Sequence, residues 1–317
     1  MALNSRLALT IGLCYLFCGA HNVYKKRLLL LFPFPWTTVS FELGWGTMWV
    51  LVAWCSRFRE SPRLSTYQKK VVAPLGMLHL AGTFATAFAM ADGSLTFTHI
   101  VMSLEPLVVA LLCWLLSRHQ ESKPALAALV PLLFGMLLAV HHQLFFKGTA
   151  FVLAMLANVI FAARGVYSKA AMQKEGMPKG GDLLAMITTM AFIGSVPFTL
   201  IVEGPQVAQG WRKAASNVGE INLLRQVFLC GITHYLYNEM AFIILGMTSP
   251  VGAGVINCIK RLVLVLSGVV SFTSDSSLTK ALGAIIAIAG SIGFATVKHH
   301  ENKALRPHDS EDIRKER

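Results

Sequence analysis

Long apolar windows recur along the whole chain, and they constrain its fold more than any other feature of the sequence. Each window holds roughly 18–24 apolar residues, which lets a helix rising about 1.5 Å per residue cross a hydrocarbon core about 30 Å thick. Only 14% of the 317 residues are charged, against about a quarter in an average soluble domain. The sequence therefore predicts an all-α membrane protein with about ten transmembrane helices. The expected spans are residues 6–24, 36–55, 72–91, 95–116, 125–140, 150–167, 183–202, 224–245, 251–272 and 281–297.

The two halves of the chain share short motifs in the same order. Residues 21–26 (HNVYKK) resemble residues 164–169 (RGVYSK), near the ends of the first and sixth spans. Residues 105–108 (EPLV) align with residues 260–263 (KRLV), and the same spacing aligns Gly135 with Gly290. These matches indicate an internal repeat, although apolar helices also resemble one another by chance.

Each repeat would contain an odd number of helices, so the second copy would lie upside down in the bilayer. Inverted repeats of this kind place a substrate site near the midplane, as in secondary transporters that work by alternating access. We therefore expect an inverted five-plus-five helix repeat. Residues 1–148 would form the first repeat, residues 149–298 the second, and residues 299–317 a cytosolic polar tail.

The net charge of +12 follows the orientation of the chain in the membrane. Lysine and arginine gather on the side of the amino terminus, above all in one short loop and in the carboxy-terminal tail. By the positive-inside rule, both termini are expected to face the cytosol. We interpret the surplus as this signal and expect a lipid bilayer and no nucleic acid as partner. The loop residues are Arg57, Arg59, Arg63, Lys69 and Lys70.

The amino-terminal apolar segment continues into Tyr24-Lys25-Lys26 without a small-residue cleavage pattern, so we interpret it as a retained helix. No Arg/Ser-rich transit peptide is recognised, which favours the Golgi, the endoplasmic reticulum or an outermost plastid membrane over an inner plastid envelope. The six cysteines lie within or at the ends of apolar spans and predict no disulfide or zinc framework.

Lys260 and Arg261 stand side by side inside an apolar run. A lysine or arginine at a helix centre costs about 2.5–3.5 kcal/mol, so packing alone does not explain the pair. Together they suit a phosphate group, because arginine offers a planar fork and lysine a compact charge. The alternative is a structural ion pair with Glu105 or Glu239.

Further polar residues in the spans each carry two interpretations. Arg164 faces a cavity or anchors the interface, and Tyr237 donates a hydroxyl if it points inward. Thr83 and Thr86 share one helix face, where they bind a ligand or bond back to their own helix. His99 and Glu105 form a proton path or a buried hydrogen-bonding pair.

Enzyme chemistry finds no support in the motifs. There is no Walker phosphate loop and hence no sign of direct ATP drive. His299 and His300 lie in the polar tail without further ligands at a metal-site spacing. The sequence predicts neither a catalytic site nor a metal site nor a cofactor.

The chain resembles the triose-phosphate and related sugar-phosphate/phosphate translocators of the drug/metabolite transporter superfamily, which are related to nucleotide-sugar transporters. The resemblance covers nearly all of residues 12–297. It implies ten helices in an inverted repeat and an antiporter that exchanges inorganic phosphate for a phosphorylated three- to six-carbon metabolite. The motifs that carry it are residues 22–26 (NVYKK), 32–36 (FPFPW), 95–99 (LTFTH), 103–106 (SLEP), 235–239 (YLYNE) and Lys260-Arg261.

The resemblance also implies roles for particular residues. The family's phosphate-binding pair falls on Lys260 and Arg261, its tyrosine on Tyr237, its third-helix threonine on Thr86 and its substrate-holding arginine on Arg164.

Two positions depart from the family pattern. Met102 stands where the family has a lysine, and Thr83 stands where it has a third-helix histidine. The lost lysine removes one cation from the site, which favours triose or sugar phosphates with a single charged group over phosphates that also carry a carboxylate.

Two other functions remain open from the sequence. One is a nucleotide-sugar transporter of the same fold, for which a nucleoside monophosphate would compete. The other is a transport-inactive membrane scaffold or retrieval factor, suggested by the tail Arg314-Lys315-Glu316-Arg317, which loosely resembles a dilysine retrieval signal.

Overall fold

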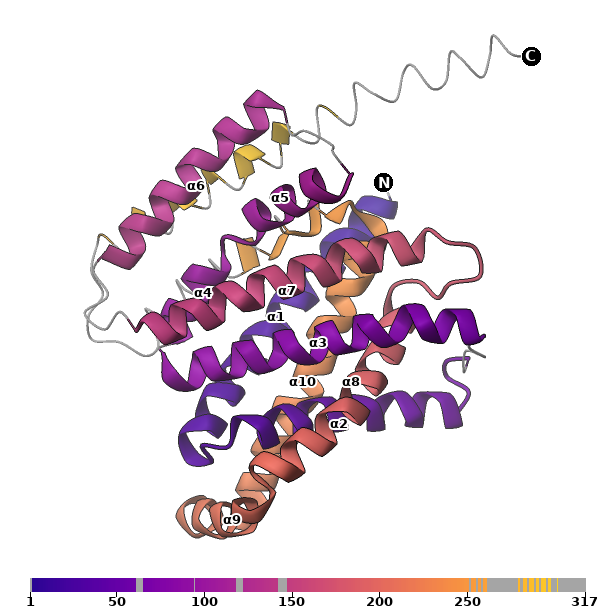
Figure 1. Cartoon of the computed structure of the whole chain (residues 1–317), viewed down its shortest axis with the longest axis vertical. Coiled ribbons are helices and arrows are strands. Elements are labelled where there is room, and N and C mark those ends of the chain that lie inside the picture. Colours follow the sequence, from indigo (N-terminus) through magenta and orange to yellow (C-terminus); the bar gives the residue numbers. More distant parts are fainter. Residues whose placement is uncertain are drawn as a thin grey trace.

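The computed structural model consists of helices and their connections. It describes residues 2–60, 65–93, 95–117, 122–141 and 147–250, and, farther on, residues 252–254, 256–257, 259–260, 279, 282–283, 285–287, 289–290, 292–294, 296–297 and 301. The helices, drawn in Figure 1, are α1 (Ala2–Leu31), α2 (Pro35–Cys55), α3 (Thr66–Asp92), α4 (Leu95–Met102), α5 (Glu105–Ser117), α6 (Lys123–His141), α7 (Gly148–Met172), α8 (Gly181–Val202), α9 (Gly204–Val218) and α10 (Glu220–Met247).

Within these described residues, five helices are long and apolar enough to cross a membrane by length and composition. The expectation of an all-α, multi-pass membrane protein is confirmed, and each expected span up to residue 245, except 95–116, lies within one helix. The expected spans 251–272 and 281–297 and the tail 299–317 lie wholly or partly outside the described residues. The five helices cover Ser5–Leu31, Thr66–Asp92, Gly148–Met172, Gly181–Val202 and Glu220–Met247.

The expected span 95–116 is interrupted, because the chain turns between α4 and α5. Ser103 donates its hydroxyl to the carbonyl of Ile100 at 2.6 Å. Pro106 follows at the second residue of α5 and has no backbone N–H to continue the helical ladder. The break puts Glu105 at the start of a new helix in the interior of the bundle, where it is buried.

The long connection after Glu203 forms the amphipathic helix α9. Val207, Trp211 and Ala214 pack on Leu28 and Phe32 near the end of α1. Glu203 itself accepts hydrogen bonds from the backbone N–H groups of residues 36 and 37, at 3.2 and 2.8 Å. Glu203 therefore caps the amino terminus of α2. The N-cap residue of α2, Phe34, makes no such hydrogen bond with its own side chain.

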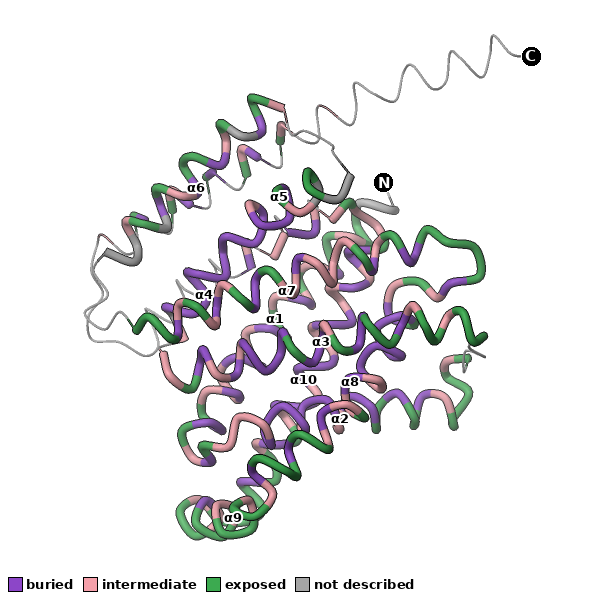
Figure 2. The backbone as a smooth tube through the Cα atoms, viewed as in Figure 1, coloured by how far each residue is buried: buried purple, intermediate pink, exposed green. Residues whose placement is uncertain are grey.

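The helix contacts come in matching pairs. In the centre of the bundle α1 packs on α10 and α3 packs on α7, while α2 packs on α8. The contact between α2 and α10 likewise has a counterpart in the contact between α3 and α8. Figure 2 shows many buried residues along these inner helices and mostly exposed residues on α9. The two halves of the chain are thus interleaved.

Two lysines hold helix ends in the same manner. Lys26 donates to the carbonyls of Met90 and Gly93 at the end of α3, at 2.8 and 3.2 Å. Lys169 donates to the carbonyls of Leu245 and Gly246 at the end of α10, at 2.9 and 3.0 Å. These cations satisfy carbonyls that have no partner within their own helix.

Two glycines let α6 and the last described helical residues approach closely. A Cβ on Gly135 would lie 2.4 Å from the backbone nitrogen of Ala287, and a Cβ on Gly290 would lie 2.4 Å from that of Leu132. Figure 1 shows the two segments side by side at one edge of the bundle. Any side chain at either glycine would force the backbones apart.

Candidate functional site

A polar cavity lies among α1, α3, α4, α7, α10 and the residues around 257–260. All predicted site residues that the structure describes line this cavity, whereas Arg261 lies outside the described residues. Whether they bind substrate stays a prediction. The lining residues that the sequence predicted are Thr83, Thr86, His99, Met102, Glu105, Arg164, Tyr237 and Lys260.

Lys260 lies at the cavity with only 6% of its surface exposed. Its ammonium donates to Oδ1 of Asn257 at 3.2 Å and lies 5.3 Å from the centre of the Tyr237 ring. Asn257 in turn donates to Oε1 of Glu105 at 3.1 Å. An amide therefore stands between the lysine and the carboxylate, which differs from the direct Lys260–Glu105 ion pair weighed above. Glu239, the other acid considered there, pairs with Arg59 instead.

Arg164 reaches the cavity from α7. Its guanidinium lies 4.7 Å from the centre of the Phe161 ring and 5.1 Å from that of Phe242, and it donates to Nδ1 of His79. Its Nε is buried and has no hydrogen-bond partner among the residues that the structure describes. Gly82 allows this arrangement, because a Cβ there would lie 2.6 Å from the Phe161 ring. The side chain therefore points into the bundle, which favours the cavity alternative over the interfacial anchor.

The two threonines of α3 bond back to their own helix. Thr83 donates to the carbonyl of His79 at 2.7 Å, and Thr86 donates to the carbonyl of Gly82 at 2.9 Å. Each hydroxyl oxygen can still accept a hydrogen bond from a ligand in the cavity that both residues line.

On the opposite wall, His99 and Met102 of α4 are both buried. Nε2 of His99 lies 3.1 Å from Oδ1 of Asn22 on α1. Met102 packs with Val101 and with alanines of α7, and it also lines the cavity. The thioether thus presents an apolar surface at the point where the resemblance led us to look for a cation.

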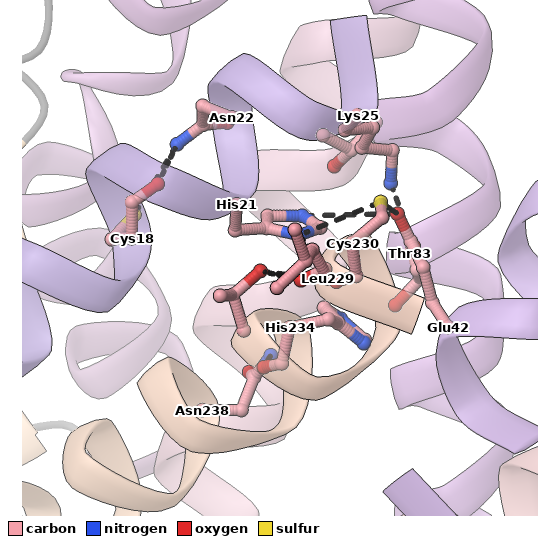
Figure 3. A network of polar contacts seen from close by, with 12 residues as sticks. Cys18, His21, Asn22, Lys25, Glu42, Thr83, Leu229, Cys230, His234 and Asn238 are labelled. Atoms are coloured by element: carbon pink, nitrogen blue, oxygen red, sulfur yellow. Dashed lines mark hydrogen bonds and ion pairs between the residues drawn. The ribbon is translucent and has the colours of Figure 1, made fainter. Parts of the chain in front are cut away.

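A set of buried polar residues around the same cavity was missed from the sequence. His79 and His234 stack with ring centres 5.8 Å apart, and His21 lies 5.1 Å from His234. Behind them, Lys25 donates to Oε2 of Glu42 at 2.9 Å, with both side chains almost fully buried (Figure 3). The signal was in the sequence, because Glu42 is an acid inside the expected span 36–55.

His21, Glu42 and Cys230 also bring three possible metal-ligand atoms within 4.8 Å of one another. The Lys25 ammonium at 2.9 Å from Glu42 already supplies the positive charge that a cation would bring to this carboxylate. We therefore assign the cluster to a buried hydrogen-bonding network.

Known transport proteins are similar to this chain over most of its length. The Triose-phosphate Transporter family matches residues 5–294. Glucose-6-phosphate/phosphate translocator 2, chloroplastic, of Arabidopsis thaliana is 31% identical over 87% of this chain and 71% of its own. Phosphoenolpyruvate/phosphate translocator 3, chloroplastic, of Oryza sativa subsp. japonica is 30% identical over 96% and 77%. Xylulose 5-phosphate/phosphate translocator, chloroplastic, of Arabidopsis thaliana is 29% identical over 94% and 72%.

A crystal structure of a protein with 16% sequence identity has the same fold, with a TM-score of 0.63 over 93% of this chain and 98% of the other. The family match extends over nearly the whole chain and includes every described residue of the cavity. The chain belongs to the Triose-phosphate Transporter family.

Proposed function

We propose that this protein is an antiporter that exchanges inorganic phosphate for a phosphorylated three- to six-carbon metabolite. The observation that carries this proposal is the meeting of two cations, the buried Lys260 and the half-buried Arg164, at one cavity inside the bundle. Arg164 keeps a buried donor without a partner among the described residues, and an anion oxygen would satisfy it. The relatives named above are phosphate translocators by their names, which points to phosphate as the common anion.

Strict exchange follows from the charge of the cavity. Without an anion, the buried cations make a closed, water-excluding intermediate costly, at about 2.5–3.5 kcal/mol per unpaired cation on insertion scales. Bound phosphate neutralises much of this charge, so the loaded carrier can reorient while the empty one is held back. Lys260, together with Arg261, would then control the cycle as well as bind the substrate.

Alternating access would use an inverted repeat of five plus five helices, residues 1–148 and 149–298. The matching lysine contacts support it, because Lys26 and Lys169 occupy corresponding places in the two motifs and each holds the end of a corresponding helix. The paired close approaches of Gly135 and Gly290 support it as well. A two-fold axis in the membrane plane would exchange each of these contacts with its counterpart.

The orientation that we propose puts both termini in the cytosol, following the basic loop between α2 and α3. The membrane would be an intracellular one, such as the Golgi, the endoplasmic reticulum or an outermost plastid membrane. In that orientation α8 begins on the cytosolic side and crosses the membrane once. The helix α9, which follows it directly, therefore lies on the side away from the cytosol.

The test is uptake of radiolabelled phosphate by the purified protein in liposomes. Liposomes preloaded with phosphate should take up label rapidly, and empty liposomes should not. Lys260→Met should lower the exchange rate at least about tenfold, because a buried charge-assisted contact with phosphate is lost. Arg27→Met, which removes an exposed cation of α1, is the matched control and should exchange like the wild type. A folded wild-type protein without exchange, or a fully active Lys260→Met variant, would overturn the proposal.

A further inference from the structure

A third cation, Lys25, stands at the wall of the cavity, and its partner lies behind that wall. Lys25 lines the cavity from α1, whereas Glu42 of α2, a described residue, does not. The ammonium of Lys25 lies 2.9 Å from Oε2 of Glu42, and the two side chains are 2% and 1% exposed. In Figure 3 the lysine nitrogen points at this carboxylate.

Two described neighbours of Glu42, Cys230 and His21, hold it in place. Its Oε1 accepts a hydrogen bond from Sγ of Cys230 at 3.3 Å and lies 3.8 Å from Nε2 of His21. Nδ1 of His21 lies 3.2 Å from the carbonyl of Cys230. A carboxylate held on both oxygens is poorly able to move, so the charge of Lys25 is balanced where it stands.

The positive charge of Lys25 at this wall is therefore balanced by the negative charge of Glu42. A substrate whose phosphate is held near Lys260 and Arg164 would extend its carbon chain toward the amide and imidazole groups of the same cavity, which include Asn22, His21 and His234. Imidazole and amide groups donate to and accept from hydroxyls. A carboxylate at the same place would find no unbalanced positive charge and would lie near the negative charge of Glu42.

We propose that Glu42 sets the substrate class of this carrier by neutralising Lys25, so that the cavity accepts phosphorylated metabolites with hydroxylated carbon chains and disfavours those that carry an additional carboxylate. This inference rests on the proposed function, since it concerns the same cavity. It assigns specificity to two residues that lie away from Met102, the position at which the resemblance located the change in charge.

The experiment compares two competitors that differ in one group. Glycerol 3-phosphate carries a hydroxymethyl group where 3-phosphoglycerate carries a carboxylate. Each competes with radiolabelled phosphate for uptake into phosphate-loaded liposomes, and the readout is the ratio of their half-inhibitory concentrations. In the wild type we expect 3-phosphoglycerate to be at least about tenfold the weaker competitor.

Glu42→Gln keeps the shape of the side chain and removes the charge that balances Lys25. The ratio should shift toward 3-phosphoglycerate by about tenfold, because the freed ammonium attracts the carboxylate. The double variant Lys25→Met/Glu42→Gln removes both charges and should return the ratio to the wild-type value. A purely structural role of the pair would lower both affinities together and leave the ratio unchanged.

The outcomes separate the two proposals. A folded wild type that exchanges no phosphate refutes the antiport function. A wild type that exchanges phosphate but shows a ratio near one refutes only the role of Glu42, as does an unchanged ratio in Glu42→Gln. If Glu42→Gln does not fold, the double variant still tests the proposal. A ratio of half-inhibitory concentrations in the double variant that differs from the wild-type ratio contradicts neutralisation.

Discussion

The contacts of Arg164 hold its guanidinium in a geometry that suits the anion we propose. Aromatic rings lie against its guanidinium on α7 and α10, and His79 accepts one of its donors. These contacts fix the plane of the guanidinium before any ligand arrives. Because the fork is rigid, the remaining donors keep a fixed direction in which two oxygens of a phosphate can be bound.

Replacing Arg164 by lysine therefore tests shape rather than charge. Arg164→Lys keeps the cation but loses the planar fork and the ring contacts, and we expect KM for phosphate in the exchange assay to rise about tenfold. Arg27→Lys, at an exposed position of α1, should leave KM unchanged. A phosphate KM within a factor of two of the wild type in Arg164→Lys would mean that only the charge matters.

The sequence located some site residues better than others for a physical reason. Lys260 stood out because a cation inside an apolar run is costly and has no acidic neighbour in the chain. Lys25 did not, because it lies next to Lys26 near the end of its expected span, where lysines usually reach toward the interface. Only the fold reveals that Lys25 turns inward to meet Glu42, which is 17 residues away.

At the scale of helices, the apolar windows predicted where α1 to α3, α7, α8 and α10 lie. They could not predict the turn between α4 and α5. The single polar residue Ser103 hardly lowers the mean hydropathy of this window, and hydropathy carries no information about backbone geometry. Pro106 was the available sign. The helix α9 was missed because its apolar stripe is short and packs on neighbouring helices, above all α10.

The glycine contact between α6 and the last described helical residues gives a prediction at this scale. Gly135→Ala and Gly290→Ala each place a methyl group about as close as 2.4 Å to a backbone nitrogen. We expect each to lower the free energy of unfolding by about 1–3 kcal/mol, because the two backbones must separate. Thermal unfolding of the purified variants in detergent measures this loss.

Gly293→Ala is the matched control, because its Cβ would make only an ordinary contact of 3.8 Å with Ala128. It should keep the wild-type unfolding temperature. If Gly135→Ala and Gly290→Ala differ strongly from each other, their contacts are not equivalent, and the inverted-repeat proposal loses one of its supports.

At the scale of the whole molecule, the two halves are joined at both ends of the bundle. At one end Arg59, between α2 and α3, lies 3.3 Å from Asp182 of α8 and also pairs with Glu239 of α10. At the other end Glu203, after α8, accepts from the hydroxyl and the N–H of Thr37 on α2, each at 2.8 Å. An alternating-access carrier must release one end at a time, so each contact is expected to oppose opening at its own end.

Breaking the two contacts separately should therefore open the cavity in opposite directions. Cys18 lines the cavity. In a background in which the other five cysteines are replaced, its reaction with a membrane-impermeant thiol reagent in sealed vesicles reports access to the cavity. Arg59→Gln should speed labelling from the side of the α2–α3 connection about tenfold, and Glu203→Gln should do the same from the side of α9. Saturating phosphate should slow both reactions, because the anion occupies the cavity. Equal acceleration from both sides in either variant would show that the contact stabilises the bundle as a whole instead of closing one end of it.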